Sequence, residues 1–228
     1  VILLSELLFY DIEKYKSKSE VYFCPNGIPV QENLIYKRKN SNKVPKLLFL
    51  SNLIESKGVF ILLDALKKVK LSGLKFRCDI VGGEGDINAE TLQHKISYNK
   101  LDGQVFANGI KTGDEKNIFF SKTDIFIFPT FYSKECFPLV LLEAMMYSIP
   151  IISTNEGAIA EIIENNKNGF IVEKQNPDVL AEKIIWLIKN PKKAARMGLE
   201  GKIKFNRNYR IDVFEKKLND ILNKIHAN

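Results

Sequence analysis

The sequence contains few of the residues that bind metals or form disulfides. It holds three cysteines and two histidines among 228 residues. Cys24, Cys78 and Cys136 lie far apart and form no CxxC pair. Since neither a disulfide framework nor a zinc site fits this spacing, we expect free thiols and a reducing compartment. His94 lies between Gln93 and Lys95, a position typical of a surface residue.

Long apolar runs and a leader sequence are also absent. No stretch approaches the ~20 apolar residues needed to span a bilayer, and the start, Val1-Ile2-Leu3-Leu4-Ser5, has no basic flank or cleavage site. The sequence begins without Met, in what reads as a strand. We therefore expect a fragment of a longer cytoplasmic protein, with contact at the inner face of the membrane left open.

The composition is ordinary for a globular protein. Hydrophobic residues make up 45% and charged residues 27% of the chain, and the net charge is +7. The positive charge is dispersed in short clusters such as Lys37-Arg38-Lys39 and Lys192-Lys193, which are typical of solvated faces. This dispersal argues against nucleic-acid binding, and it favours anionic ligands or a membrane surface.

From Lys46 onward, short apolar runs alternate with helical periodicity. We expect strands at residues 47–50, 76–81, 104–106, 124–128, 149–153 and 169–172. We expect helices at residues 59–69, 89–98, 114–120, 139–147, 157–164 and 177–188. This alternation predicts an α/β fold, with a Rossmann-like parallel sheet that helices cover on both faces.

The two ends of the chain read differently from this middle part. We expect a strand at residues 1–4, a helix at 6–15 that begins after Ser5, and a strand at 21–24. Residues 29–44 are polar and basic and read as a linker, while residues 191–225 read as helical, with a long C-terminal helix from about Arg210.

Right-handed crossovers would gather the strand-to-helix loops at one edge of the sheet. That edge would carry Lys57-Gly58, the glycine loop 82–86, the loop 129–137 and Glu156-Gly157, and ligands of such sheets bind there. Glu135 and Glu143 lie eight positions apart, one before the expected helix and one inside it.

Each of these residues also has a simpler explanation. Glu135 can merely favour the start of a helix while Glu143 faces solvent. The glycines after residue 81 can form an ordinary turn, and they do not match GxGxxG. Lys57 can be a solvated side chain, although an ammonium group beside a helix N-terminus also suits a diphosphate.

Several of these motifs resemble those of glycosyltransferase family 4, the retaining GT-B enzymes also called glycosyl transferases group 1. Residues 135–145 (ECFPLVLLEAM) resemble the family's Glu–seven–Glu motif, and residues 51–58 (SNLIESKG) resemble its Arg/Lys loop. Similar matches occur in the family's order over about residues 21–175: PNGI at 25–28, VGGEG at 81–85, GAIAE at 157–161 and NGF at 168–170.

The resemblance implies a donor site for a UDP- or GDP-linked sugar, without a metal or cofactor. Lys57 would neutralise the diphosphate, Glu135 would face the donor sugar or reacting centre, and Glu143 would accept hydrogen bonds from the ribose. Residues expected to line the rest of the donor site are Asn52, Gly82, Gly83, Cys136, Phe137, Pro138, Leu139 and Val140. The catalytic pair would be Glu135 and Lys57.

The resemblance also implies three segments. Residues 1–23 would be a remnant of the N-terminal GT-B domain, 24–208 the donor-binding domain, and 209–228 a helix that packs on the missing domain. That missing domain would bind a glycan or lipid-linked acceptor in cell-surface polysaccharide synthesis, and we expect this chain alone to be inactive.

The chain departs from the family pattern at several positions. Asn52 stands where the family has Arg, Cys136 where Gly is common, and Pro138 removes one N–H group from the expected phosphate contacts. These departures leave two alternatives open: a degenerate nucleotide-sugar-binding module without turnover, and, less favoured, a Rossmann oxidoreductase.

Overall fold

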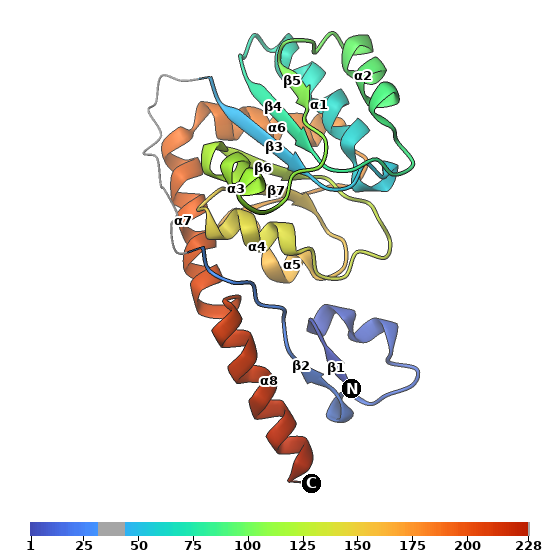
Figure 1. Cartoon of the computed structure of the whole chain (residues 1–228), viewed down its shortest axis with the longest axis vertical. Helices are drawn as coiled ribbons and strands as arrows, with labels where there is room; N and C mark the ends of the chain where they lie inside the picture. The colour runs from blue at the N-terminus through green and yellow to red at the C-terminus, as the bar shows by residue number, and fades with distance from the viewer. Residues whose placement is uncertain (32–43, 228) are drawn as a thin grey trace.

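The computed structural model describes residues 1–31 and 44–227, and its central feature is a parallel six-stranded sheet. The strands are β3 (Lys46–Leu50), β4 (Arg77–Val81), β5 (Val105–Ala107), β6 (Ile125–Phe128), β7 (Ile151–Thr154) and β8 (Gly169–Val172). Their order is β5-β4-β3-β6-β7-β8, so the direction of chain progression reverses between β3 and β6 (Figure 1). This confirms the predicted Rossmann-like α/β fold.

The strands form where the sequence has short, almost continuous apolar runs. Leu47, Leu48 and Phe49 of β3 are fully buried, as are all four residues of β6. Such runs occur in strands that are covered on both faces, because side chains on either side of the sheet then leave water.

Helices cover both faces of the sheet. They are α1 (Val59–Leu71), α2 (Ala89–Tyr98), α3 (Gly113–Lys122), α4 (Leu139–Met146), α5 (Ile159–Ile162), α6 (Pro177–Lys189) and α7 (Pro191–Asn208), whereas the last helix, α8 (Ile211–His226), lies beyond the sheet (Figure 1). Helix α1 packs against α6 behind the sheet in the view of Figure 1, and α4 packs against α7, with α3 and α4 in front. The right-handed crossovers that connect parallel strands produce these two layers.

The first 23 residues form a small unit of their own. Strands β1 (Ile2–Leu3) and β2 (Tyr22–Phe23) pair in parallel, and the segments between them are the 3₁₀ helices η1 (Glu6–Asp11) and η2 (Lys18–Glu20). The Ser5 cap is confirmed, because its hydroxyl accepts a hydrogen bond from the N–H of Leu7 at 3.1 Å. The expected α-helix at 6–15 is wrong in type and length: η1 buries none of its residues, and so short a helix gains little without a packed face.

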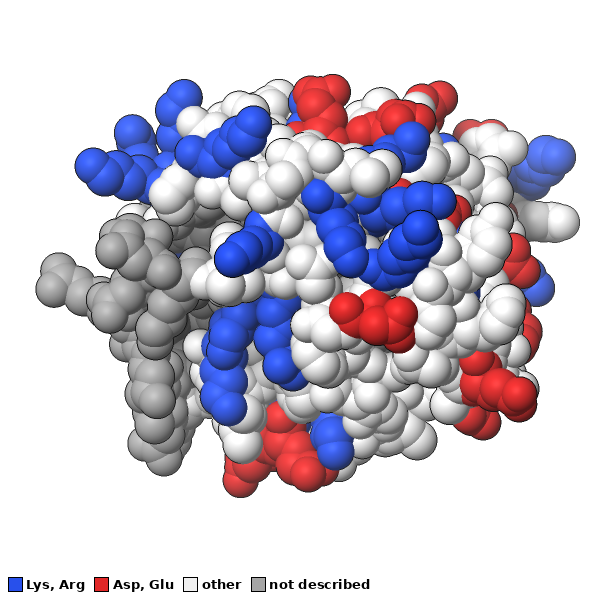
Figure 2. Space-filling model, turned by 90° about the horizontal axis from the view of Figure 1, so that it is seen from above, with Lys and Arg blue, Asp and Glu red and all other residues white. Residues whose placement is uncertain are grey.

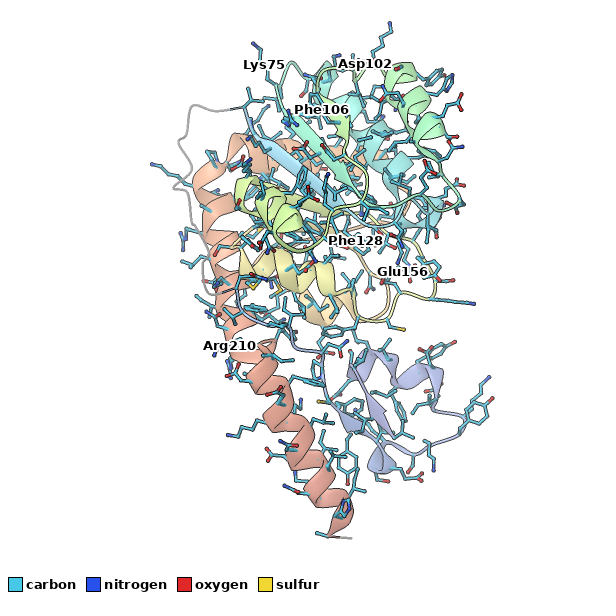
Figure 3. The ribbon with its side chains drawn as sticks, viewed as in Figure 1. Lys75, Asp102, Phe106, Phe128, Glu156 and Arg210 are labelled. Carbon is cyan, nitrogen blue, oxygen red and sulfur yellow. The ribbon has the colours of Figure 1, made fainter. Side chains whose placement is uncertain are left out.

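The segment that follows the N-terminal unit contacts the C-terminal helices. Ile28 donates its N–H to the carbonyl of Tyr209 and accepts from the N–H of Ile211, both at 3.0 Å. This is where α7 ends and α8 begins, beside the labelled Arg210 in Figure 3. Helix α8 then extends away from the six-stranded sheet and runs beside β1 and β2 (Figure 1). The boundaries at 23 and 209 stay predictions, and the expected linker at 29–44 lies largely outside the described residues.

Candidate functional site

The loops that follow β3 and β6 lie side by side at the carboxyl edge of the sheet. The N–H of Phe131 donates to the carbonyl of Ser56 at 2.7 Å, and the hydroxyl of Thr130 donates to the same carbonyl at 3.3 Å. Because the strand order reverses between β3 and β6, this is the position at which parallel α/β sheets bind ligands.

Lys57 and Glu135 form an ion pair across these two loops. The ammonium lies 2.7 Å from Oε2 of Glu135, with side chains 14% and 9% exposed. The same ammonium lies 4.3 Å from the centre of the Tyr132 ring and 5.8 Å from that of Phe128, which Figure 3 labels at the end of β6. The carboxylate and the two rings thus hold a nearly buried positive charge at the edge of the sheet.

Gly58 allows the loops to approach this closely. It ends the short 3₁₀ helix η3 (Glu55–Lys57) with φ of +86°, and a Cβ atom built on it would lie 2.1 Å from the carbonyl oxygen of Pro129. A side chain there would force the two loops apart. The Lys57-Gly58 pair in the sequence therefore combines a charge with the glycine that positions it.

Glu143 forms a second ion pair, with a residue that the sequence did not single out. Nζ of Lys116 in α3 lies 2.5 Å from Oε1 of Glu143 in α4, and the side chains are 27% and 19% exposed. Glu143 is therefore not a freely solvated side chain. Lys116 follows Asp114 and Glu115 on the surface of a helix, so its sequence context is that of a solvated lysine; only the packing of α3 and α4 on one face of the sheet identifies it.

The glycine loop after β4 packs against the loop after β3. A Cβ atom on Gly82 would lie 1.7 Å from the carbonyl oxygen of Ser51, and the N–H of Leu53 donates to the carbonyl of Gly83 at 2.7 Å. The side-chain oxygen of Asn52 lies 3.7 Å from the Cβ position of Gly83. The packing role of Gly82 agrees with the turn interpretation, and a phosphate role for Gly82, Gly83 and Asn52 stays a prediction.

The residues between Glu135 and Glu143 divide between the core and the surface. Phe137 is buried and packs edge-on against Tyr209 at 5.9 Å between ring centres, so its ring belongs to the core. Pro138 is the N-cap of α4, and Leu139 is 43% exposed. The N–H groups of Leu139 and Val140 belong to the first turn of α4, where helical N–H groups lack intrahelical partners.

Cys136 is exposed, and its carbonyl accepts a hydrogen bond from the N–H of Ala158 at 2.8 Å. All three cysteines are free, and burial raises the pKa of the Cys78 thiol. Within residues 1–31 and 44–227, no group of three or more His, Cys, Asp or Glu side chains is placed to hold a metal ion. The expectation that the site works without a metal or cofactor stays a prediction.

The family model described as "Glycosyl transferases group 1" matches residues 30–204. The chain belongs to this family. The match covers the ion pair of Lys57 with Glu135, that of Lys116 with Glu143, and the glycine loop. It confirms the resemblance, and it identifies a transferase family in place of the oxidoreductase alternative.

Two relatives illustrate the similarity. An uncharacterized glycosyltransferase of Methanocaldococcus jannaschii is 30% identical over 198 residues, which are 83% of this chain and 49% of the relative. The amylovoran biosynthesis glycosyltransferase AmsK of Erwinia amylovora is 26% identical over 184 residues, which are 79% of this chain and 45% of the relative. The chain spans about half the length of both.

A solved structure supports the same fold. Anabaena Alr3699/HepE in complex with UDP superposes with a TM-score of 0.86 and 20% sequence identity over 98% of this chain and 63% of that protein. At this identity the likeness shows the fold alone. Among the helices of the described residues, none is long and apolar enough to cross a membrane.

Proposed function

We propose that this glycosyltransferase family member binds a nucleoside diphosphate sugar, UDP- or GDP-linked, at the carboxyl edge between β3 and β6. The observation that carries the proposal is the nearly buried pair of Lys57 and Glu135 at the point where the strand order reverses. A lysine held at such an edge suits a ligand with a negatively charged diphosphate. The UDP complex of the structural neighbour supports a nucleotide donor of this class.

In this proposal the charged residues act on different parts of the donor. The ammonium of Lys57 and the N–H groups of Leu139 and Val140 stabilise the diphosphate as the bond to the anomeric carbon breaks and its electron pair leaves with the diphosphate oxygen. Glu135 faces the sugar and holds Lys57 in place. Glu143 accepts hydrogen bonds from the ribose hydroxyls, since a carboxylate offers two acceptor oxygens to a vicinal diol.

Lys116 adds a function to the ribose site. Its contact with Oε1 of Glu143 keeps that carboxylate oriented, while Oε2 and the second lone pair of Oε1 accept from the two ribose hydroxyls. We propose that transfer proceeds with retention and without a metal or cofactor, as the family resemblance implies.

The acceptor and the cellular role are part of the same proposal. We assign to the whole protein a glycan or lipid-linked acceptor in cell-surface polysaccharide assembly, at the inner face of the membrane; the name of the relative AmsK, an amylovoran biosynthesis glycosyltransferase, supports the biosynthetic role. Because the chain spans about half the length of its relatives, we assign acceptor binding to a part of the whole protein outside residues 1–228.

Calorimetric titration of this chain with UDP and with GDP tests the donor site. We expect Lys57→Met and Glu143→Ala each to weaken binding of the preferred nucleotide by about 10- to 100-fold, the amount that a lost charge-assisted hydrogen bond is worth. Lys57→Arg should recover part of the loss, since it restores the positive charge. Unchanged affinity in both Lys57→Met and Glu143→Ala would refute the assignment.

Two controls separate binding from folding. Lys216 on α8 is exposed, so Lys216→Met removes the same charge far from the site and should bind as the unmodified chain does. Glu135→Gln combined with Lys57→Met avoids leaving a buried carboxylate unpaired. If this double variant melts normally and still binds nucleotide tightly, Lys57 does not contact the diphosphate.

A further inference from the structure

A cavity of about 340 Å³ lies on the part of the sheet formed by β3 and β4, next to α3. Its lining includes Lys46, Arg77, Asp79, Asn108, Phe119 and Lys122. Lys46 and Arg77 begin β3 and β4, so they lie at the opposite ends of these strands from the loops that carry Lys57 and Gly82. The cavity is therefore separate from the proposed donor site.

The strand pattern explains why a sheet surface is polar here. Arg77 and Asp79 alternate with the buried Cys78 and Ile80 along β4, so they share the face on which α3 lies. Lys46 is the neighbour of Arg77 in the β3–β4 register. The cavity thus has a floor of regular strands, which gives its side chains fixed positions.

The one carboxylate of the lining is already neutralised. Nη2 and Nε of Arg77 lie 2.8 Å from Oδ1 and 3.1 Å from Oδ2 of Asp79, and the amide of Asn108 donates to Oδ1 at 3.2 Å. The guanidinium also lies 3.9 Å from the centre of the Phe106 ring, which Figure 3 labels. Asp79 is buried, with a side chain 12% exposed, so this bidentate pair is part of the wall.

The two lysines of the lining have no such partner. In the described part of the chain, no acceptor lies within hydrogen-bond or ion-pair distance of the ammonium group of Lys46 or of Lys122. The nearby carboxylate of Asp124 accepts a hydrogen bond from the backbone N–H of Lys46 at 2.8 Å. Among the described residues, these two ammonium groups therefore border the cavity without a direct ion-pair partner, beside a guanidinium whose own charge is balanced by Asp79.

We propose that this cavity binds a small phosphate monoester that carries hydroxyl groups. Lys46 and Lys122 suit the two negative charges of a phosphate monoester at neutral pH. Asn108 and the remaining lone pairs of Asp79 suit hydroxyl groups, and Phe119 supplies an apolar wall for carbon atoms. The volume lies near the lower end of the ~300–1,000 Å³ typical of ligand pockets, so the ligand is small.

Titration calorimetry with glycerol 3-phosphate tests the proposal. We expect binding by the unmodified chain, weakened by about tenfold or more in Lys122→Glu and in Lys46→Gln, since each removes a charge-assisted contact. Lys216→Glu, with the same charge change on α8, should bind within about twofold of the unmodified chain, because charges beyond a screening length contribute little. Inorganic phosphate and glycerol should each bind more weakly than the ester.

A second comparison separates this cavity from the proposed donor site. Lys57→Met should leave glycerol 3-phosphate binding unchanged while it weakens UDP binding, and Lys122→Glu should do the reverse. Binding that is lost in Lys57→Met and kept in Lys122→Glu would place the phosphate at the carboxyl edge and refute the proposal. Equal affinity of all variants for glycerol 3-phosphate would also refute it. So would the absence of binding both to this ester and to vesicles that present a phosphate monoester.

Binding to vesicles that contain phosphatidic acid tests whether the phosphate monoester belongs to a lipid headgroup or to a soluble molecule. This lipid presents the same group at a membrane surface. Sedimentation with these vesicles that is lost in Lys122→Glu but kept in Lys216→Glu would support a headgroup as the ligand. If neither the soluble ester nor the vesicles depend on Lys122, the proposed site does not exist.

Discussion

Glu135 is fixed through its backbone as well as through its carboxylate. Gly157, in the loop after β7, has φ of +49°, and a Cβ atom on it would lie 1.8 Å from the carbonyl oxygen of Glu135. Next to it, the N–H of Ala158 donates to the carbonyl of Cys136. The loop after β7 therefore supports the loop that carries the carboxylate, and the ion pair with Lys57 depends on a third segment of the chain.

We predict that Gly157→Ala lowers the free energy of unfolding by at least about 2 kcal/mol. The alanine would have to adopt a left-handed backbone conformation, and its Cβ atom would clash with the carbonyl oxygen of Glu135. It should also weaken UDP binding, since the clash displaces the backbone of Glu135. Urea unfolding and UDP calorimetry measure the two effects.

Gly73 provides the control, because it has φ of +81° with nothing within 4 Å of its Cβ position. Gly73→Ala should therefore lower the free energy of unfolding by only about 1 kcal/mol and leave UDP binding intact. Equal costs in the two variants would contradict this account.

At the level of single residues, the sequence identified three charged candidates and missed one. Lys57, Glu135 and Glu143 stood out through their motif spacing, and all three are ion-paired. Lys116 could not be found, because an ion pair between two helices depends on tertiary packing and leaves no local pattern. The sequence also could not show that the ring of Phe137 is a core contact, since its partner Tyr209 lies 72 positions later.

Helix α7 is positioned by a glycine at its contact with the turn before β7. A Cβ atom on Gly198 would lie 2.0 Å from the carbonyl oxygen of Ser148, whereas one on Gly201, a turn later, would lie 3.5 Å from the side chain of Met145. The first distance allows no side chain, and the second is an ordinary van der Waals contact. Two buried glycines on one helix therefore differ in what they tolerate.

We predict that Gly198→Ala lowers the free energy of unfolding by about 1–3 kcal/mol, because α7 must move away from α4 and the turn. Gly201→Ala should be neutral or stabilise the protein by up to about 1 kcal/mol, the gain in helix propensity. Urea unfolding followed by circular dichroism measures both. A neutral Gly198→Ala, or a Gly201→Ala that destabilises as strongly, would show that α7 is not held by this close approach.

At the level of elements, periodicity predicted the middle of the chain well. Helix α2 and strand β8 lie at the predicted residues, and the other strands of the six-stranded sheet begin and end within about two residues of the prediction. The failures share a cause. Helix η1 and the four-residue α5 are short segments whose extent depends on what they pack against.

At the level of the whole molecule, the excess positive charge is spread over the surface. Seen from above, from the end where β4 and β5 lie, several groups of Lys and Arg side chains alternate with smaller groups of Asp and Glu (Figure 2). The net charge of +7 therefore acts as a diffuse field as well as through Lys57. Such a field attracts anionic ligands from a distance, and salt screens it, whereas a partly buried ion pair is screened much less.

This difference predicts how salt acts on nucleotide binding. Lys192 and Lys216 are exposed on α7 and α8, and changing both to Glu lowers the net charge from +7 to +3. At about 10 mM salt, where the screening length is ~30 Å, we expect this double variant to bind UDP a few-fold more weakly than the unmodified chain. At about 1 M salt, where the screening length is ~3 Å, the difference should vanish.

Lys57→Met provides the contrast, because it removes a contact and not only a distant charge. Its binding defect should persist at both salt concentrations, because the Lys57 side chain is only 14% exposed and its ammonium group meets the diphosphate with little water between them. Calorimetry of the unmodified chain, the double variant and Lys57→Met at the two salt concentrations separates the two contributions. A defect of the double variant that survives at high salt would mean that α7 or α8 contacts the nucleotide. If the Lys57→Met defect disappears at high salt, Lys57 acts on the nucleotide only through long-range attraction and does not contact the diphosphate.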